Sequence, residues 1–410
     1  MPLLIRLAVR NLWRNRRRTI LTFGAVALGI VYLILVDSLL RGLTQSSIDN
    51  LLDFESGDLQ IHAPGYFDER EDLPLEPALP VDRLINEVRA VAGVRAAAPR
   101  LVAPARLHAG WEEFPVVLVG IEPELDSGTL RIMDYVEGRA PENGAAEAMI
   151  GASLAELLEI GTGDWVVLTT RTRDGAIQAL DVRVTGLVRT PNPNVNRNHV
   201  YLPLNTLGES LAVPGEATVI VVRAGAGESL KELARRVGEH LAAAGTAADV
   251  YTWEQSNAEL VALIRTETVS DGLVIAIILA ISLVGIANTT LLSALERRRE
   301  IGTMKALGMR EGEIVGLFLL EAVATGLLAV GTGFAVGAAA NAYLVAVGMD
   351  ISAFFGDLDV GYPVTGVVYG VWHPQTFVLA GAAGLVTCAL AAYLPARRAA
   401  RQDAAATLRP

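Results

Sequence analysis

The sequence predicts an α-helical membrane protein with four transmembrane helices and a large extracytoplasmic α/β domain inserted between the first and second helices. Apolar residues make up 52% of the 410 residues, and they are concentrated in four long runs rather than spread evenly. Such runs are typical of membrane spans, because a helix needs about 20 apolar residues to cross a bilayer. Basic residues border the runs, whereas acidic residues dominate the long stretch between the first two.

The first apolar run begins at Thr19 and carries Asp37 as its only charge. A signal peptide is the competing interpretation, but its hydrophobic region should be only about 7–15 residues long. The small-residue pattern from Ala25 to Ala27 also lies in the middle of the run rather than after it. We therefore predict a retained span here and three more farther along. The four predicted spans are residues 19–42, 272–295, 314–347 and 376–394.

Arginine clusters set the predicted orientation. They lie in the N-terminal segment 1–18, in the loop 296–313 and in the tail 395–410. Basic residues beside membrane spans remain in the cytoplasm, and four spans place both termini on the same side. A nucleic-acid patch is the alternative, but every cluster abuts an apolar run. The sequence therefore predicts a multi-pass protein of the cytoplasmic membrane with both termini in the cytoplasm, in contact with membrane lipids and without a nucleic-acid partner. Residues 55–267 and the loop 348–375 would then lie outside.

Residues 55–267 are expected to form an α+β domain with a smaller inserted lobe at about 145–207. Alternating apolar residues predict strands, and two stretches have helical spacing. Ser229 and Glu232 predict a capping box at the start of the second helix. The first span should continue as a stalk to about residue 54, and residues 253–269 should lead into the second span. The predicted strands are 57–63, 115–121, 165–170, 181–188 and 218–223; the predicted helices are 81–91 and 229–244.

This domain shows no pattern typical of an active site. Between residues 43 and 270 there are 34 acidic residues and 18 basic ones, which predicts a solvated acidic surface or a face that docks a basic partner. The histidines are scattered without metal-ligand spacing. Cys388 is the only cysteine, so no disulfide within the chain is available to stabilise the domain. We predict no catalytic residue, no metal site and no cofactor in this chain.

The third span contains two features of interest. Glu321 is an intramembrane carboxylate, which is costly unless it is paired or faces water. It is expected to be a structural partner near the interface, with a proton or substrate relay as the alternative. Gly333 and Gly337 form a G-x-x-x-G pattern, which lets another helix approach closely, either within the monomer or in a dimer.

The loop between the second and third spans has the pattern of a short amphipathic helix. Ile301, Met304 and either Leu307 or Gly308 fall on one face, and charged residues surround them. This small apolar face suits docking to a partner better than anchoring in a membrane; a solvated loop is the alternative. The candidate coupling residues are Glu296, Arg298, Glu300, Ile301, Met304, Lys305, Leu307 and Gly308.

This loop also carries a family resemblance. The run ERRREIGTMKALGM, followed by a glycine-rich span with Glu321, resembles the permeases of the MacB/FtsX/LolC–LolE superfamily of ABC transporters. The start LAVRNLWRNRRRTILT and the tail LPARRAARQDAAATLR are similar to the two ends of that family, and the order of spans and domain agrees. The segment YTWEQSNAELVALIRTET is most similar to the lipoprotein-releasing (Lol-type) branch.

The resemblance implies a permease subunit of the inner membrane with a periplasmic domain. It would pair with a second permease, identical or paralogous, and with two ATPase subunits. Residues 296–313 would be the coupling helix, and ATP and Mg would bind in the ATPase. A lipoprotein substrate with a periplasmic carrier, or an adaptor, would be the outer partner. The chain departs from fused MacB proteins because neither of its two lysines, Lys231 and Lys305, lies in the Gly-Lys-Ser/Thr of a P-loop. The alternatives are a mechanotransmitting subunit of a MacB-like exporter or FtsX-like regulator, and a membrane-anchored sensor without energy coupling.

Overall fold

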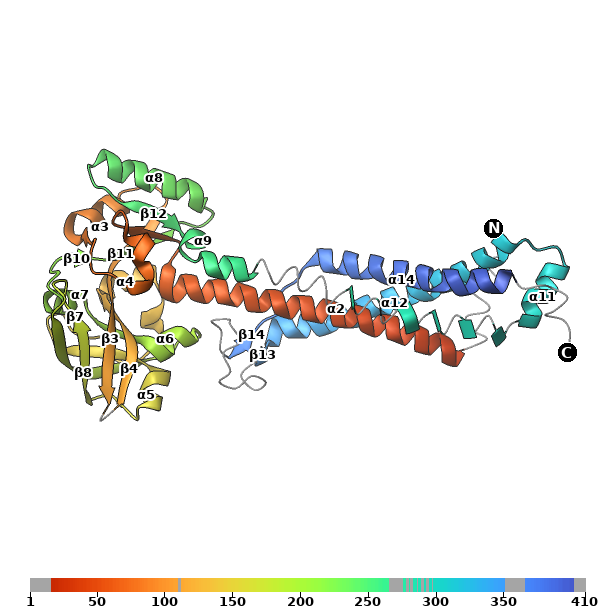
Figure 1. Ribbon diagram of the computed structural model, residues 1–410, viewed down its shortest axis with the longest axis horizontal. Coiled ribbons are helices and arrows are strands. Elements are labelled where there is room, and N and C mark those ends of the chain that lie inside the picture. Colours follow the sequence, from red (N-terminus) through yellow and green to blue (C-terminus); the bar gives the residue numbers. More distant parts are fainter. Residues whose placement is uncertain are drawn as a thin grey trace. The chain divides into compact units, whose positions relative to one another are not determined.

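The computed structural model describes residues 16–109, 112–264, 298–350 and 366–401, together with isolated residues between 276 and 296 (Figure 1). The chain divides into two compact units. The helical unit consists of Met1–Leu43, Leu263–Asp350 and Val367–Pro410, and the sheet unit of Thr44–Ala262 and Ile351–Gly366. Helix α2 (Arg16–Leu51) contributes residues to both.

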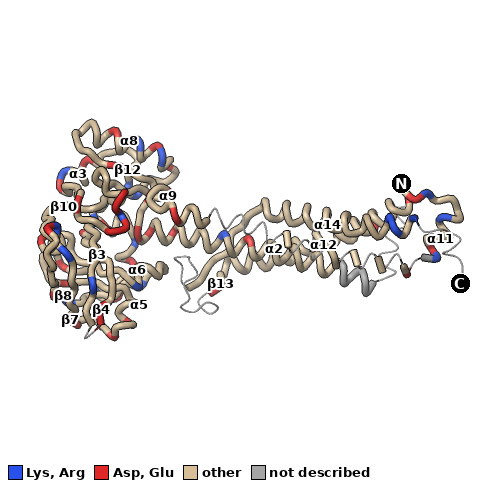
Figure 2. The backbone as a smooth tube through the Cα atoms, in the orientation of Figure 1, with Lys and Arg blue, Asp and Glu red and all other residues tan. Residues whose placement is uncertain are grey.

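Three helices within the described residues are long and apolar enough to cross a membrane. They are α2 with its continuation (Phe23–Ser56), α12 (Glu311–Val347) and α14 (Pro374–Ala400). The second predicted span, 272–295, lies largely outside the described residues. Charged residues are sparse along these three helices and dense on the sheet unit (Figure 2). Large apolar side chains such as Leu28, Leu327 and Val378 are exposed on them, as expected of side chains that face lipid.

Small residues bring the three helices together. A Cβ on Gly326 of α12 would lie 3.2 Å from Cys388 Sγ of α14. A Cβ on Gly384 would lie 3.2 Å from Ile30 Cδ1 of α2. The packing therefore depends on close helix approach, which small residues permit where lipid gives no hydrophobic drive.

Helix α14 is longer than the predicted span 376–394. It continues through the arginines assigned to the tail and ends at Ala400. Ala396, Ala399 and Ala400 are buried against α12 and α11 (Arg298–Ala306). Burial of this alanine stripe explains why the helix does not end with the apolar run. A short pair of strands, β13 (Met349–Asp350) and β14 (Val367–Val368), completes the helical unit.

The sheet unit is built on a ten-stranded mixed sheet of order β12-β1-β11-β3-β4-β9-β6-β8-β5, in which β7 pairs with β3 and β8. All five predicted strands are present in it, although their ends shift by up to four residues; the others were not predicted. The strands of this sheet are β1 (Leu59–His62), β3 (Val94–Ala109), β4 (Glu112–Ile121), β5 (Val136–Gly138), β6 (Glu147–Gly151), β7 (Trp165–Arg171), β8 (Ile177–Val188), β9 (His199–Pro203), β11 (Val219–Ala224) and β12 (Asp249–Thr252).

Strand β3 joins the two halves of this sheet. Its first part pairs with β11 as far as Arg100, and its second part pairs with β4 from Leu101 onward. The side chain of Thr218 bridges the change of partner, since its Oγ1 accepts the N–H of Val102 at 2.9 Å. The lobe predicted at 145–207 therefore shares its sheet with β3 and β4, which precede it in the sequence.

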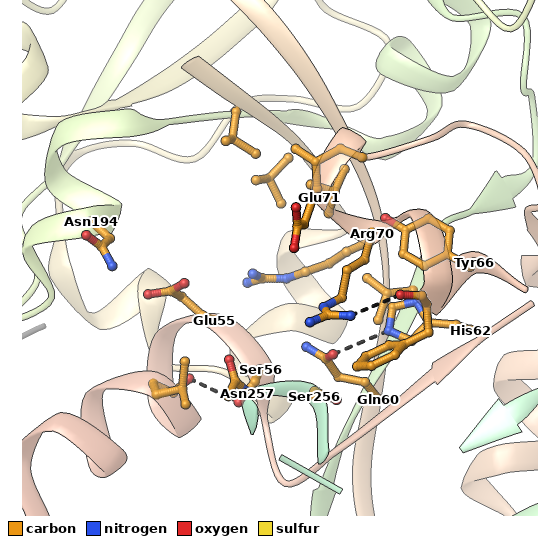
Figure 3. A pocket seen from close by; sticks show the side chains of 18 of the residues that line it. Glu55, Ser56, Gln60, His62, Tyr66, Arg70, Glu71, Asn194, Ser256 and Asn257 are labelled. Carbon is orange, nitrogen blue, oxygen red and sulfur yellow. Dashed lines mark hydrogen bonds between the residues drawn. The ribbon is translucent and has the colours of Figure 1, made fainter. Parts of the chain in front are cut away.

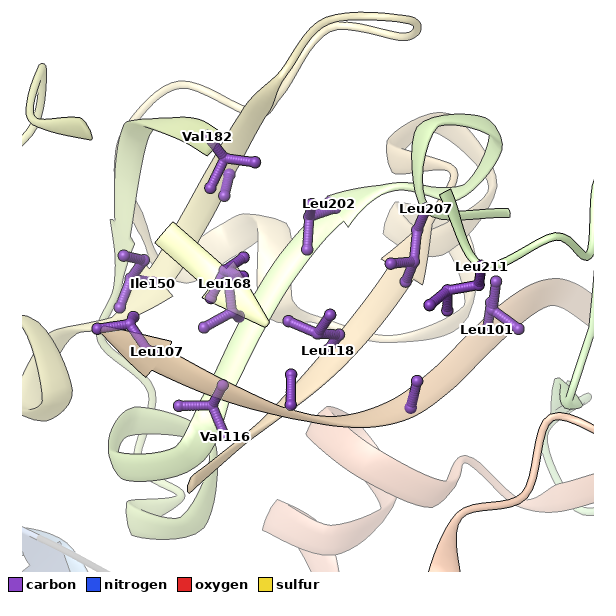
Figure 4. Packing of buried hydrophobic residues seen from close by; sticks show 14 of the residues in the cluster. Leu101, Leu107, Val116, Leu118, Ile150, Leu168, Val182, Leu202, Leu207 and Leu211 are labelled. Carbon is purple, nitrogen blue, oxygen red and sulfur yellow. The ribbon is translucent and has the colours of Figure 1, made fainter. Parts of the chain in front are cut away.

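The two largest hydrophobic cores of the described residues lie on this sheet. The larger one gathers Leu107, Leu118, Ile150 and Leu168 from four strands (Figure 4). The smaller one lies between β1, β11 and two helices predicted from the sequence, α3 (Val81–Arg89) and α8 (Leu230–Ala243). The remaining elements are η2 (Tyr66–Asp72), β2 (Leu79–Pro80), α4 (Pro123–Thr129), η3 (Ile132–Tyr135), α5 (Ala152–Leu157), α6 (Pro193–Asn198), α7 (Leu204–Ser210), β10 (Glu216–Ala217) and α9 (Trp253–Ser256).

The predicted capping box of α8 is wrong. Ser229 is the N-cap residue, but its side chain makes no capping hydrogen bond. Glu232 pairs instead with Arg235 on the same helix. A salt bridge one turn farther on therefore occupies the carboxylate that the capping box requires.

The end of α2 is tied firmly into the sheet unit. The helix changes to a π-helical turn, η1 (Leu52–Ser56), which ends at Gly57. Arg223 of β11 holds this turn: its guanidinium donates to the Leu52 carbonyl at 3.2 Å and to Asp53 Oδ1 at 2.7 Å. It also donates to the Thr129 carbonyl at 3.1 Å. One half-buried arginine therefore closes the carbonyl end of the helix and joins it to a central strand.

The first and last segments of the sheet unit are neighbours, because β1 pairs with β12 in antiparallel register. The N–H of Trp253, the first residue of α9, donates to the carbonyl of Asp58 at 3.1 Å. Residues 258–264 continue as a helix after α9. The predicted stalk residues beyond 264 lie outside the described part of the chain.

Candidate functional site: the turn between α11 and α12

Helix α11 is held by its own chain through its apolar face. Ile301 is only 2% exposed, and it packs with Ile314 and Phe318 of α12 and with the alanine stripe of α14. Met304 and Met309 cover the edge of this cluster. Ile301, on the face that the sequence predicted to dock, is therefore packed inside the helical unit with Met304 half-buried beside it, and both residues fix the position of α11.

The end of α11 is a complete Schellman motif. Gly308 adopts a φ of +94°, a conformation that glycine adopts without strain. Its N–H donates to the Lys305 carbonyl at 2.9 Å, and the N–H of Met309 donates to the Met304 carbonyl at 3.1 Å. These bonds satisfy carbonyls that a helix end leaves open. Gly308 therefore sets the geometry of the turn.

Helix α12 begins directly after this motif. The N–H of Arg310 donates to Glu313 Oε2 at 2.9 Å, and Lys305 Nζ lies 3.5 Å from Glu311 Oε1 across the turn. Both helix ends are thus capped within a few residues, which makes the turn well defined.

Leu307 is the exposed apolar side chain at this turn. It is 83% exposed, beside exposed Thr303 and Ala306. An exposed leucine contributes little to the stability of the isolated chain, which makes Leu307 a candidate for contact with a partner. Glu296 is also exposed, whereas Glu300 is half-buried. The side chain of Arg298 lies outside the described part of the structure.

The predicted features of the third span lie on α12. Glu321 is half-buried, and its backbone carbonyl accepts the Thr325 hydroxyl at 2.9 Å. A Cβ on Gly333 would lie 3.0 Å from Ile30 Cβ, and one on Gly337 would lie 2.8 Å from Ile34 Cδ1. In this structure the two glycines therefore face α2 of the same chain.

A polar network between α2 and the start of α14 was not predicted. The hydroxyl of Thr376 donates to Asp37 Oδ2 at 2.6 Å, and Arg41 Nε donates to the same oxygen at 3.0 Å. Because that hydroxyl is the donor to Asp37, His373 Nδ1–H must be the donor in its 2.8 Å contact with Thr376 Oγ1. The sequence signal was Asp37, the only acidic residue in the first predicted span, but Thr376 and His373 lie at the far end of the sequence.

The described residues contain no group of three or more His, Cys, Asp and Glu side chains that could hold a metal ion. The turn between α11 and α12 presents one exposed leucine, Leu307, and a few charged residues between two capped helix ends.

Two family models match the chain. One is described as the MacB-like periplasmic core domain and matches residues 19–240, and the other as the FtsX-like permease C-terminal and matches residues 272–404. The second match contains α11, α12 and α14. The large α/β unit is therefore of the MacB periplasmic type, beside membrane-capable helices of the FtsX type.

Several known proteins are similar over most of the chain. Macrolide export ATP-binding/permease protein MacB 2 of Aeromonas hydrophila subsp. hydrophila is 25% identical over 422 residues, which cover 97% of this chain and 59% of that protein. MacB of Escherichia coli is 24% identical over 415 residues, with the same coverage of 97% and 59%. An uncharacterized ABC transporter permease of Methanocaldococcus jannaschii is 24% identical over 349 residues, 79% of this chain and 80% of that protein.

Among solved structures, the periplasmic region of MacB from Actinobacillus actinomycetemcomitans matches with a TM-score of 0.37 and 14% identity, over 51% of this chain and 94% of that one. The chain spans about three fifths of the length of the MacB proteins that it matches over nearly its whole sequence.

Proposed function

The chain belongs to the superfamily of MacB- and FtsX-type permeases, and on that premise we propose that it is the membrane subunit of an ABC transporter. ATP would be hydrolysed by an ATPase outside these 410 residues, because neither Lys231 nor Lys305 lies in a P-loop. This chain would convert ATPase movement into work outside the cytoplasm. It would itself bind neither ATP nor Mg.

The observation that carries this proposal is the exposed Leu307 on the capped turn between α11 and α12. Leu307 with Thr303 and Ala306 would enter a groove of the ATPase, and Glu300 and Lys305 would flank the contact. A push on this turn would move α12, whose first residues pack with Ile301 and the end of α14. Two copies, or this chain and a paralogue, would bind two ATPases.

The proposed orientation places the turn and both termini in the cytoplasm and the sheet unit in the periplasm. The arginines around the loop 296–313 and the tail support it through the positive-inside tendency. The MacB-like periplasmic core match to residues 19–240 supports it independently for the sheet unit.

The similar proteins favour a MacB-type mechanotransmitter that drives an exporter as the work performed, because several MacB proteins match most of this chain. Lipoprotein release from the inner membrane to a carrier is the second candidate. It is supported by the likeness of residues 251–268 to the Lol-type branch. A regulator of an extracytoplasmic enzyme would use the same movements with a different outer partner.

The test is to isolate the tagged chain from its native membrane in mild detergent and to identify every bound protein by mass spectrometry. Recovery of an ATPase with an adaptor supports the exporter, and an ATPase with a lipoprotein or soluble carrier supports the second candidate. The Leu307→Asp variant should lose the ATPase while keeping its outer partners. If the wild-type chain recovers no ATPase under conditions that preserve another ABC complex, the proposal is wrong.

A further inference from the structure

A cavity of about 720 Å³ opens in the sheet unit. Its size lies in the range of small-molecule and peptide sites, roughly 300–1,000 Å³. Its floor is one face of the sheet, with Val102 of β3, Val117 and Val119 of β4, and Val219 of β11. These valines share a face because side chains alternate along a strand and the register pairs Val102 with Val119.

The walls come from segments that are far apart in the sequence. Glu55 and Asn194 lie on one side of the open space, and Arg70 and Glu71 lie on the other (Figure 3). Ser256 and Asn257, at the end of α9, contribute the third side. The cavity therefore touches both the turn that ends α2 and the residues that follow β12.

The deepest polar group is Arg100, which is 4% exposed. Its Nε and Nη2 donate to the two carboxylate oxygens of Asp126, each at 2.9 Å. The remaining N–H groups of this guanidinium have no acceptor among the described residues, yet Arg100 lines the cavity. Since Asp126 already balances its charge, these N–H groups call for a neutral acceptor such as an amide carbonyl.

Acceptors lie near this arginine. Glu55 uses one oxygen to accept the side-chain N–H of Asn192 at 2.5 Å. His199 donates from Nδ1 to the Asn194 carbonyl at 3.2 Å, and burial lowers the pKa of this histidine, so its Nε2 is an acceptor. The cavity thus offers a guanidinium donor together with a carboxylate and an imidazole acceptor. A group with an adjacent C=O and N–H, as in a peptide bond, satisfies both.

The aromatic residues argue against a sugar, which would need a free ring face. The rings of His62 and Tyr66 stack with their centres 4.7 Å apart, and those of Phe67 and Tyr251 stack with their centres 4.3 Å apart. The guanidinium of Arg70 also lies 4.3 Å from the centre of the Phe67 ring. Of the floor valines, Val102 and Val117 are partly exposed, and they suit aliphatic side chains.

At the rim, Glu71 and Glu259 are exposed and have no ion pair among the described residues. With Glu55, the cavity is lined by three carboxylates. Of its guanidinium groups in the described part of the chain, only that of Arg70 is not already paired with a carboxylate. The rim therefore favours a basic group next to the aliphatic part of a ligand.

We infer that this cavity binds a short polypeptide segment that carries aliphatic side chains and an adjacent basic residue. The aliphatic side chains lie on the valine floor, and a backbone carbonyl accepts from Arg100. A backbone N–H donates to Glu55 or His199, and the basic residue lies between Glu71 and Glu259. Peptide binding here does not depend on the ATPase or on the transport reaction.

The test measures binding of three labelled peptides to the purified full chain in detergent by fluorescence anisotropy. They are acetyl-Lys-Val-Leu-Val-Gly-amide, the same peptide with Glu in place of Lys, and acetyl-Lys-Ser-Gly-Ser-Gly-amide. The Lys-Val-Leu-Val-Gly peptide should bind at least about threefold more tightly than its Glu form, the scale expected of exposed ion pairs. The Ser-Gly peptide should bind weakly or not at all.

Two variants locate the binding. Asn194→Trp places a ring at the exposed mouth and should weaken binding about tenfold or more, whereas Asn143→Trp, at an exposed position outside the cavity lining, should not change it. Glu71→Gln with Glu259→Gln should remove the preference for Lys over Glu. The inference is overturned if no peptide binds, if Asn194→Trp binds as the wild type does, or if maltose displaces the label while an unlabelled copy of the peptide does not.

Discussion

Among single residues, Gly57 has an unusual backbone requirement. Its φ of 61° and ψ of −165° fall in a region that is essentially restricted to glycine. An added Cβ would lie 2.5 Å from Val221 Cγ1 and 3.0 Å from the Val222 carbonyl oxygen. The chain therefore leaves the π-helical turn and enters β1 only because this residue has no side chain.

Gly57→Ala should destabilise the sheet unit by about 2–4 kcal/mol, which combines backbone strain with overpacking. Gly65→Ala is the matched control, because Gly65 also has a positive φ of 85° but no atom within 4 Å of an added Cβ. Gly65→Ala should lower the free energy of unfolding by only about 1 kcal/mol. Thermal unfolding of the purified variants measures the difference, and equal costs at the two positions would contradict the crowding at Gly57.

His62 gives the sheet unit a pH dependence. Burial is the main cause that lowers its pKa from 6.5 to about 4, against the hydrogen bond to the Thr218 carbonyl and the charge of Asp249. A histidine with a depressed folded pKa binds fewer protons in the folded state than in the unfolded state. Its neutral form therefore supports full stability above about pH 6.5, and this contribution is lost as the pH falls toward 4.

Protonation of His62 should lower the free energy of unfolding by about 3 kcal/mol between about pH 6.5 and pH 4, as the size of the pKa difference predicts. Urea unfolding of the chain between pH 7 and pH 4 should show it. His62→Gln should be less stable at pH 7 but should have a flatter pH profile over the same range. An unchanged slope in this variant would mean that other groups cause the acid sensitivity.

At the scale of elements, the two ends of α11 have separate roles. Ile301→Asp puts a charge into the cluster with Ile314 and Phe318 and should destabilise the helical unit by about 3 kcal/mol or more. Leu307→Asp changes an exposed side chain and should leave unfolding within about 0.5 kcal/mol of the wild type. Leu307→Asp should nevertheless abolish stimulation of the ATPase by the permease.

The control for this pair is Leu157→Asp, which changes an exposed leucine of the sheet unit. Thermal unfolding and ATPase activity of the reconstituted complex separate the outcomes. If Leu307→Asp keeps full stimulation, the turn is not the coupling contact. If Ile301→Asp folds as well as the wild type, the packing of α11 against α12 is wrong.

A second contact between elements is made by Arg223, which joins η1 to β11 and α4. Arg223→Gln removes the ion pair with Asp53 and leaves that carboxylate, the Leu52 carbonyl and the Thr129 carbonyl short of donors. Arg223→Gln should lower the free energy of unfolding by about 2–4 kcal/mol. Arg131→Gln is the control, since its pairs with Asp53 and Asp134 are more exposed and longer, at 3.5 and 3.2 Å.

Hydrogen exchange at residues 50–58 should therefore accelerate in Arg223→Gln and remain near the wild-type rate in Arg131→Gln. If Arg223 also positions the end of α2 for transport, less substrate will move per ATP in this variant while basal ATPase activity is kept. Equal exchange in the two variants would assign the stability of this turn to other contacts.

The elements that were predictable from the sequence are those with strong local patterns. Strands such as β7 and β11 and the helices α3 and α8 follow from apolar spacing. Strand β3 was missed because its alanines and its two prolines, Pro99 and Pro104, have low strand propensity. Its sixteen residues form a strand because β11, β4 and β7 pair with it. Tertiary pairing of that kind leaves no local signal.

The same distinction applies to the candidate site. The spacing of Ile301 and Met304 correctly indicates an apolar helix face, but spacing alone does not say whether a partner or the chain itself covers it. Here the alanine stripe at the end of α14 covers it. The cavity around Arg100 and the network of Asp37 with Thr376 join residues that are distant in sequence. Neither was predictable without the fold.

At the scale of the whole molecule, charge segregation predicts one topology. The acidic sheet unit and the arginine-rich loop 296–313 should lie on opposite sides of the membrane. Cys388 is buried and is the only native cysteine. A Cys388→Ser chain is therefore a suitable background for placing single cysteines at Ser127 in the sheet unit and at Ala306 beside the turn, both of which are exposed.

In cells with a permeable outer layer and an intact cytoplasmic membrane, a membrane-impermeant maleimide should label Ser127→Cys. It should label Ala306→Cys only after the cytoplasmic membrane is opened, because the turn must face the cytoplasm to meet an ATPase. Labelling of both sites in intact cells would place the turn outside. That result would exclude energy coupling through Leu307, whereas the expected pattern would leave the ATPase contact as the next step to test.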